Sequence, residues 1–518
     1  MTAKVWGFLK YYHPNVAKGK YNWDQNLFEV LERVENVTDK TTYSQVLTTW
    51  ITSLGNIKKC KKCESKSDTT SFDKNFNLTW LENELYFTKE LIDKLKFIKA
   101  NRHLGNKHYA YIQKSRAGQI GIRNELEYKN FDWKDKNLRL LTLFRHWNII
   151  EYFFPYKYQM DTNWNDVLIE MIPKFLNVKS EIELHAAMLE LVVSIDDSHS
   201  GLSSKKVAEF IGNYWIPAYF RIIDNKAIIT GFYNDSLAKK DDIQKGDIIT
   251  AVNGKTIENI FNEKKDLISG SNLSRKRLNA FSYIFNGSTD SVFISFERNG
   301  KSSSKIIKRY LYKDFDYTPK QQTNYKILDG NIGYINMAAL SIKEVPEAMK
   351  KFEHTKAIIF DIRNYPKGTM WYLGHFTTSK KVDFFKALEP NINYPGKFTW
   401  QNGRKYGKNQ ELPYKGRLVA LVNEYSQSFA EFTTMALQTA DNLTTIGSQT
   451  SGADGNVSRF EMVGGYKTQM SGIGIFYPDG TETQRKGVKI DLEIKPTIKG
   501  IVEGKDEVLD RAIEFINN

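Results

Sequence analysis

The sequence predicts a multidomain α+β fold, and three observations predict it. The N-terminal part contains an internal repeat with helical spacing, the middle alternates in the manner of β-strands, and the C-terminal part alternates apolar strands with helices. A chain of 518 residues has room for three or four domains of ~100–200 residues each. We expect a helical unit with a linking segment at 1–130, a second helical unit at 131–205, a small β-rich module at 206–310 and an α/β domain at 320–518.

Composition and charge exclude several classes of protein. Hydrophobic residues make up 41% of the chain and charged residues 26%, as in an ordinary globular protein. The net charge is +14, but the lysines are scattered and no nucleic-acid-binding motif is present, so we expect no nucleic-acid partner. No stretch approaches ~20 apolar residues, so we expect no transmembrane segment. The oligomeric state is left open.

The two cysteines, Cys60 and Cys63, form a Cys-x-x-Cys pair. Such a pair can be a redox site, half of a zinc site or a local disulfide. No second pair completes a zinc site, so we expect a disulfide or an incidental pair, with no metal and no cofactor. The absence of later cysteines fits an exported protein. The first residues are not a signal peptide, so we expect a periplasmic or cell-surface protein whose signal has been removed, with a cytoplasmic protein as the alternative.

The repeat in the N-terminal part has an offset of 141 residues. Four positions of the first copy recur in a single register: Trp6, Pro14, Trp23 and Leu27 match Trp147, Pro155, Trp164 and Leu168. Apolar residues at 26–35 and 166–175 recur with helical spacing. We therefore expect two related helical units.

The two copies of the repeat differ at their ends. Only the second copy continues into Asp-Ser-His-Ser-Gly at 197–201. A purely structural repeat could end alike in both copies, so the Ser198-His199 step indicates an addition for chemistry. The alternative for His199 is a structural histidine at a helix end, which is the commoner role of a lone histidine.

Residues 215–265 contain β-type segments and the hairpin signal Asn253-Gly254. The stretch Gln-Lys-Gly-Asp-Ile-Ile-Thr-Ala-Val-Asn-Gly-Lys at 244–255 resembles part of a PDZ domain. PDZ domains bind extended peptides, often at their C-termini, by adding a strand to the edge of a sheet. The resemblance implies a peptide or polypeptide partner, and a β-module that serves only as a spacer is the alternative.

Apolar segments at 333–336, 357–363 and 418–423 are typical of buried strands, and 430–440 is predicted to be helical. Ser428 lies where the third of these strands turns into the helix. Such a position exposes a side chain at the sheet edge, beside the backbone N–H groups of a helix N-terminus, as an acyl-transfer nucleophile requires. A serine before a helix is also a common N-cap, which is the other interpretation.

Four segments of the C-terminal part carry a family resemblance. They read Val-Asn-Glu-x-Ser-x-Ser-x-x-Glu at 422–431, Phe-Asp-Ile-Arg-Asn at 360–364, Gly-Ser-Gln-Thr-Ser-Gly at 447–452 and Gly-Val-Lys-Ile-Asp at 487–491. In this order they resemble the tail-specific, C-terminal-processing serine peptidases. The resemblance implies an α/β core of the crotonase/ClpP-like type and places the nucleophile three residues before the glutamate, which selects Ser428.

A serine nucleophile requires a base. Many members of this family use a lysine in a Thr-Phe-Gly-Lys-Gly loop, but here the loop reads Thr-Ser-Gly-Ala-Asp-Gly, with Ala453 at the lysine position. The tricorn-like branch of the family uses a histidine from an upstream Ser-His step. The resemblance to this branch implies that His199 is the base and that Ser198 helps to orient it.

The resemblance also implies the remaining residues of the site. The tricorn-like branch has a glutamate three residues before the Gly-Val step, where this chain has Gln484, and Glu482 is the other candidate for the orienting residue. The expected oxyanion hole consists of the backbone N–H groups of Phe429 and Gly368.

These observations predict a serine peptidase that hydrolyses peptide bonds through an acyl-enzyme on Ser428, with His199 as the general base. A peptidase-like protein that binds peptides with little or no cleavage is the alternative, because Ala453 and Gln484 depart from the family pattern. Hydrolysis of a non-peptide ester or amide by the same serine is a third hypothesis. No Gly-x-Ser-x-Gly motif is present, which disfavours an ordinary α/β-hydrolase.

Overall fold

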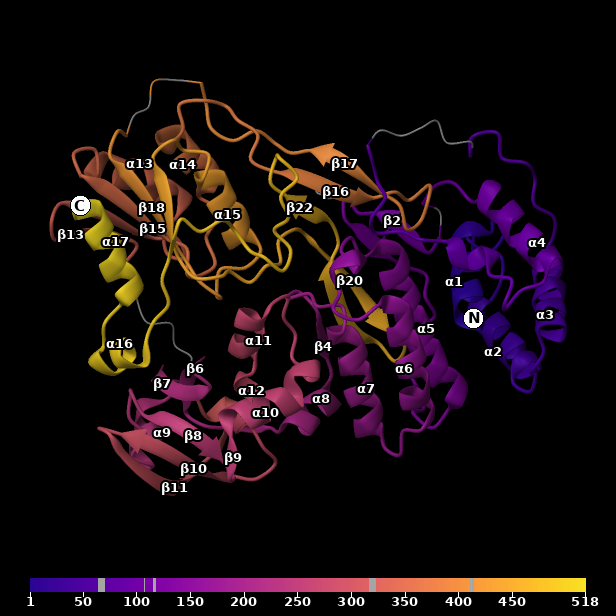
Figure 1. The fold of residues 1–518 in the computed structure, drawn as a ribbon, viewed down its shortest axis with the longest axis horizontal. Coiled ribbons are helices and arrows are strands. Elements are labelled where there is room, and N and C mark those ends of the chain that lie inside the picture. Colours follow the sequence, from indigo (N-terminus) through magenta and orange to yellow (C-terminus); the bar gives the residue numbers. More distant parts are fainter. Residues whose placement is uncertain (64–69, 107, 115–117, 316–322, 410, 412–413) are drawn as a thin grey trace.

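The computed structural model describes residues 1–63, 70–106, 108–114, 118–315, 323–409, 411 and 414–518 (Figure 1). The predicted fold class is confirmed: a helical N-terminal region, a β-rich module and a mixed α/β core follow one another along the chain. The predicted start of the core, at residue 320, lies outside the described residues.

Each copy of the sequence repeat forms three helices. The helices are α1 (Thr2–Tyr12), α2 (Trp23–Val34) and α3 (Lys40–Ser53) in the first unit, and α5 (Lys136–Phe153), α6 (Trp164–Leu176) and α7 (Glu181–Val193) in the second. In both units the repeated tryptophans exchange two hydrogen bonds, because each buried indole N–H donates to the backbone carbonyl of its partner. The distances are 2.9 and 3.2 Å for Trp6 with Trp23, and 2.7 and 3.1 Å for Trp147 with Trp164.

The segment between the two units connects the helices to the C-terminal part. Its elements are β1 (Ser71–Phe72), η1 (Thr79–Glu82), α4 (Lys89–Ala100), β2 (Ala110–Ile112) and β3 (Ile120–Ile122). Strand β1 pairs with β17 (Phe398–Asn402), so this segment extends a sheet of the core. Cys60 and Cys63 form a disulfide, which confirms the first of the two expected outcomes for the pair.

The β-rich module is built on one antiparallel sheet with the strand order β11-β10-β8-β7-β6. The strands are β6 (Ala218–Ile223), β7 (Lys226–Phe232), β8 (Ile248–Val252), β10 (Ser291–Arg298) and β11 (Lys301–Lys308), with β9 (Lys255–Thr256) paired to β8. The hairpin between β8 and β9 turns at Asn253 and Gly254, both with positive φ, as an Asn-Gly hairpin requires. Around the sheet lie α8 (Lys205–Ile211), α9 (Asp235–Lys240), α10 (Ile257–Lys264), η3 (Lys265–Leu267), α11 (Leu273–Asn279) and α12 (Phe281–Phe285).

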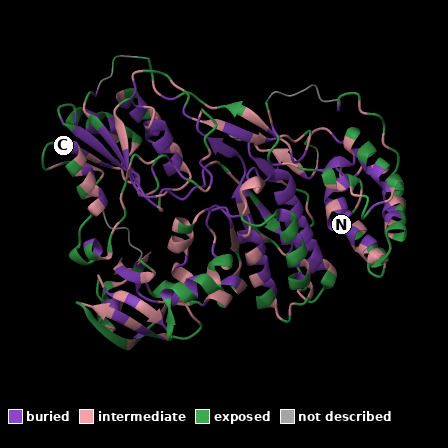
Figure 2. Ribbon diagram, in the orientation of Figure 1, coloured by how far each residue is buried: buried purple, intermediate pink, exposed green. Residues whose placement is uncertain are grey.

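The core contains a six-stranded sheet with the order β13-β14-β15-β18-β19-β23. The strands are β13 (Tyr325–Leu328), β14 (Ile332–Asn336), β15 (Ala357–Asp361), β18 (Arg417–Val422), β19 (Leu443–Gly447) and β23 (Leu492–Glu493), parallel from β14 onwards. Alternate residues of the strands face two clusters: Ile358 and Phe360 lie in one and Ile359 in the other. Helices cover both faces, which explains why the central strands are continuously apolar (Figure 2).

The helices of the core divide between the two faces of this sheet. The cluster on one face includes residues of α13 (Val345–Lys351), α14 (Met370–Thr377) and α15 (Phe429–Leu437), and the cluster on the other includes residues of α17 (Glu507–Asn517). A further short helix, α16 (Ile498–Glu503), lies before α17.

Two smaller sheets join the core to earlier parts of the chain. One has the order β1-β17-β16-β22, with β16 (Lys386–Pro390) and β22 (Gly474–Phe476). The other has the order β20-β21-β4, with β20 (Val457–Met462), β21 (Tyr466–Ser471) and β4 (Gly201–Ser203). Because β4 directly follows the Ser198-His199 step, its pairing with β21 fixes that step against the core. No helix in the described part of the chain is both long and apolar enough to cross a membrane.

Candidate active site

Ser428 occupies a strained turn between β18 and α15. Its backbone has φ 56° and ψ −117°, a conformation that residues other than glycine rarely adopt. Such strain persists only where surrounding contacts enforce it, and it concentrates at active sites. Here the backbone N–H of Ser428 donates to the carbonyl of Ala453 at 3.0 Å, and Phe432 N–H donates to the carbonyl of Ser428 at 2.9 Å. The turn therefore presents Ser428 as a nucleophile elbow would.

A buried carboxylate, Glu431, ties the nucleophile turn to the loop that follows β19. Glu431 accepts hydrogen bonds from the backbone N–H groups of Ser428, Gly452 and Ala453 at 2.8–3.2 Å, and from the Thr450 hydroxyl at 2.6 Å. Burial raises the pKa of Glu431 to about 6, and these hydrogen bonds act in the opposite direction. The family glutamate thus has a structural role under the nucleophile.

His199 reaches the same site from the loop after α7. The side chain of Gln427, which precedes Ser428, donates to the backbone carbonyl of Ser198, which precedes His199, at 3.3 Å. Both Ser428 and His199 line one cavity of about 780 Å³. Two residues that are 229 positions apart in the sequence therefore meet at one site.

The Nδ1 atom of His199 is held by two residues that the sequence did not single out. Nδ1 lies 2.9 Å from the Ser471 hydroxyl and 3.8 Å from Oδ1 of Asp197. Asp197 is fully buried and also accepts from the Ser471 hydroxyl at 3.0 Å, from Ser471 N–H at 2.6 Å and from His199 N–H at 3.1 Å. With Nδ1 engaged in this way, Nε2 is the nitrogen that remains to take a proton.

The protonation of His199 is biased towards the neutral imidazole. Burial lowers the pKa of His199, Asp197 opposes this shift, and the guanidinium groups of Arg275 and Arg459 lower the pKa further. A neutral imidazole is the form that can act as a base.

The three residues expected to orient His199, namely Gln484, Glu482 and Ser198, make their side-chain hydrogen bonds to other groups. The side-chain N–H of Gln484 donates a hydrogen bond to the Ser271 hydroxyl at 3.4 Å. In the described part of the chain, no hydrogen bond joins Gln484 to His199. Glu482 accepts from the Tyr158 hydroxyl. The Ser198 hydroxyl donates to the carbonyl of Ser451 at 3.0 Å, so it anchors the backbone of the Ser-His step. The orienting contacts at Nδ1 come instead from Ser471 and Asp197.

Of the two backbone groups expected to hold the oxyanion, only that of Phe429 belongs to a residue that lines the cavity. Phe429 is the first residue of α15 and lines the cavity, and a helix leaves its first N–H groups without intrahelical acceptors. Gly368, with φ 76°, precedes α14 and is not among the residues that line the cavity. Its neighbour Tyr365 lines the cavity, with its ring 6.3 Å from that of Phe429.

The cavity offers no lysine as an alternative base. Its described lining contains arginines at 275, 404 and 459 but no lysine, and Ala453 is buried with its backbone bonded to Ser428. In the described ranges no group of three His, Cys, Asp or Glu side chains could hold a metal ion. The arrangement can therefore support nucleophilic catalysis by a serine with a histidine base.

Comparison with known families agrees with this geometry. Residues 331–494 match the model of peptidase family S41, and residues 196–272 match the PDZ domain. The protein is a member of peptidase family S41 with a PDZ domain. It is thus a serine-type hydrolase acting on peptide bonds, and the predicted serine peptidase is confirmed at the level of family S41.

Two solved structures of mature CPAF share the fold of this S41 peptidase at low sequence identity. Mature CPAF in complex with lactacystin is 12% identical with a TM-score of 0.58, over 74% of this chain and 99% of that chain. Mature CPAF alone is 14% identical with a TM-score of 0.58, over 74% and 98%. The photosystem II D1 C-terminal processing protease is 14% identical with a TM-score of 0.42, over 71% and 98%. None of the curated proteins matches the chain significantly in sequence.

The PDZ module of this peptidase has a groove beside its edge strand. A cavity of about 130 Å³ lies between β6, represented by Phe220 and Ile222, and α11, represented by Leu278. Strand β6 ends the path of the sheet, so its outer edge can accept a peptide strand. Glu424 of the nucleophile loop also lines this groove and forms an ion pair with Arg221 of β6, so the groove adjoins the active site.

Proposed function

We propose that this S41 peptidase cleaves peptide bonds through an acyl-enzyme on Ser428, with His199 as the general base. The observation that supports this most strongly is the meeting of a strained serine turn and a buried histidine at one cavity, although the two lie far apart in sequence. The absence of lysine from the described cavity lining supports histidine as the base.

The reaction follows from the positions of these groups. The Ser428 hydroxyl oxygen forms a bond to the scissile carbonyl carbon, and its proton passes to Nε2 of His199. The imidazolium then gives that proton to the leaving amine as the C–N bond breaks. A water molecule attacks the acyl-enzyme in the same way, its proton passing through His199 to the Ser428 oxygen, and the peptide acid is released.

Two sets of neighbours assist these steps in the proposal. The N–H group of Phe429, at the first position of α15, stabilises the oxyanion, and Gly368, two residues before α14, is the expected second donor. Asp197 and the Ser471 hydroxyl keep Nδ1 fixed and stabilise the imidazolium while it exists.

The PDZ module supplies the peptide in this account. An extended chain pairs with the outer edge of β6 over the groove beside α11, and the chain continues to Ser428. The contact between Arg221 and Glu424 keeps the two sites together.

Kinetics of three variants test the proposal. We expect Ser428→Ala and His199→Ala each to lower kcat by ~10³-fold or more, and the double variant to lose little beyond either one, because the groups act as a unit. Thermal unfolding monitors the fold. If the wild type binds peptides without turnover, the protein is a peptide-binding relative; if His199→Ala keeps full activity, another group is the base.

A further inference from the structure

Three arginines surround the cavity that contains Ser428. Arg275 comes from α11 of the PDZ module, Arg404 follows β17, and Arg459 lies on β20. They reach the cavity from three separate parts of the fold, so the positive charge is a property of the site and not of one basic segment. Arginine guanidinium groups remain charged and bind carboxylates in a planar, two-pronged geometry.

None of the three has a carboxylate partner among the ion pairs of the described residues. The Nε of Arg275 is buried without a hydrogen-bond partner, and its Nη1 donates to the backbone carbonyl of Glu424 at 3.2 Å. Arg404 stacks on the ring of Trp371 at 4.2 Å. Arg275 is half-buried and Arg404 and Arg459 are exposed, so all three guanidinium groups can donate hydrogen bonds to an anionic ligand in the cavity without breaking an ion pair in the described part of the protein.

The carboxyl groups of the same cavity do not cancel this charge. Only Glu389 and Asp454 are acidic among the described residues of its lining, against three arginines. Burial raises the pKa of both carboxyls, and for Asp454 the neighbouring Glu431 raises the pKa further. The Oδ2 atom of Asp454 is buried without a hydrogen-bond partner in the described part of the chain.

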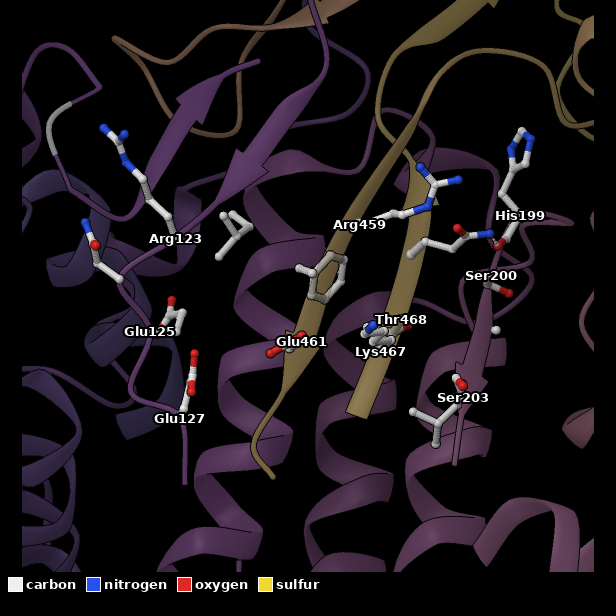
Figure 3. Close-up of a pocket in the computed structure, with 16 residues that line it drawn as sticks. Arg123, Glu125, Glu127, His199, Ser200, Ser203, Arg459, Glu461, Lys467 and Thr468 are labelled. Carbon is white, nitrogen blue, oxygen red and sulfur yellow. Dashed lines mark hydrogen bonds between the residues drawn. The ribbon is translucent and has the colours of Figure 1, made fainter. Parts of the chain in front are cut away.

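One of the three arginines, Arg459, lines a second cavity together with His199. His199 and Arg459 line both the Ser428 cavity and a second cavity of about 790 Å³. In Figure 3 His199 and Arg459 lie at one end of that second cavity, and Glu125 and Glu127 lie at the other. The second cavity is thus of mixed charge, whereas the positive charge is concentrated where the reacting bond must lie.

We propose that Arg275, Arg404 and Arg459 form a carboxylate-binding subsite, so that the peptidase prefers substrates with an acidic group close to the scissile bond. The carboxylate can be a Glu or Asp side chain or the C-terminus of a short peptide. This inference rests on the proposed function of Ser428, because it assigns a substrate class to that site.

Matched peptides measure the preference. In an otherwise neutral peptide that the wild type cleaves, one Glu is moved through the three positions on each side of the scissile bond, each time paired with Gln. A second set compares a free C-terminus with its amide. We expect kcat/KM to be about 10-fold or more higher for Glu than for Gln in at least one position, or for the free acid than for the amide, according to which carboxylate the site takes.

Binding to Ser428→Ala measures the same preference without turnover. Calorimetry with the same peptide pairs should show a comparable ratio of Kd values. Arg459→Gln and Arg275→Gln should each bring the ratio towards one. Arg511→Gln, which removes a surface arginine paired with Glu514 on α17, is the matched control and should keep the ratio. If Arg275→Gln does not fold, Arg459→Gln and Arg404→Gln give the same information.

The outcomes separate this inference from the proposed function. Equal Kd and equal kcat/KM for all matched pairs would overturn the acidic subsite and leave Ser428 chemistry intact. A Kd preference that disappears in the arginine variants, in a protein that never cleaves, would support the subsite and contradict the peptidase mechanism.

Discussion

At the scale of single residues, the candidate site combines two local patterns, one around Ser428 and one around His199. Ser428 follows an apolar strand and precedes a helix, and His199 lies where the second repeat departs from the first. Ser471 was not predictable as a partner of His199, because 272 positions separate the two residues and only the pairing of β4 with β21 brings them together. Asp197 lies two residues before His199, but its position in the sequence does not show that its carboxylate faces Nδ1. Gln484 lies at a motif position that predicted a contact with His199, but its side chain donates to the Ser271 hydroxyl. A position in a motif therefore does not determine which groups a side chain contacts.

A prediction at this scale concerns Asp197. Asp197→Asn removes the group that raises the pKa of His199, so that pKa should fall further. The base is active when neutral, so the acidic limb of the kcat/KM profile, which should lie below pH 6.5 in the wild type, should move to lower pH. We also expect kcat to fall by ~10²-fold or more, because the imidazolium loses its counter-charge. Stopped assays across pH 4–9 measure both effects.

The change in the acidic limb of the kcat/KM profile between variants is more informative than the pH at which that limb lies in the wild type. The pKa of Glu431, about 6, falls in the same pH range, so a midpoint alone would not assign the limb to His199. Ser471→Ala gives a milder test, since it removes the hydroxyl at Nδ1 and leaves the carboxylate. An unchanged limb in both variants, with folding intact, would mean that Asp197 and Ser471 do not act through His199.

At the scale of elements, the helical repeat was predictable because tryptophans mark it. A buried indole needs an acceptor for its N–H, and both units meet this need in the same way. The contribution of α11 to the active site was not predictable. The sequence places α11 beyond the β-type stretch, yet Arg275 lines the cavity of a domain that begins about 50 residues later.

The paired tryptophans give a prediction about stability. Trp6→Phe and Trp147→Phe each remove one buried indole N–H and leave a carbonyl of the partner tryptophan without its donor. We expect each to lower the free energy of unfolding by about 1–3 kcal/mol. Because the two units share the same geometry, the losses should be similar. Denaturant unfolding measures them, with Trp133→Phe, which replaces a tryptophan outside the pairs, as the control. A loss confined to one variant would contradict an equivalent role for the pairs.

At the scale of the whole molecule, the active site is assembled from three parts of the chain. His199 follows the last helix of the second helical unit, Arg275 lies on α11 just after the residues that match the PDZ domain, and the core contributes Ser428. Strands β1 and β4 join sheets of the core, so the parts interlock and are not independent domains in series (Figure 1). The sequence could predict the order of the parts from their periodicity. It could not predict this interlocking, because two- and three-residue strands have no periodicity to read.

The acyl-enzyme is the central claim of this account, and its capture tests the claim most directly. The wild type is mixed with an activated acyl ester, quenched in acid, digested and mapped by mass spectrometry. We predict a single acylated residue, Ser428, with no adduct in Ser428→Ala and much slower acylation in His199→Ala at neutral pH. Acylation of a different residue during turnover, or hydrolysis that continues in Ser428→Ala at the wild-type rate, would contradict it.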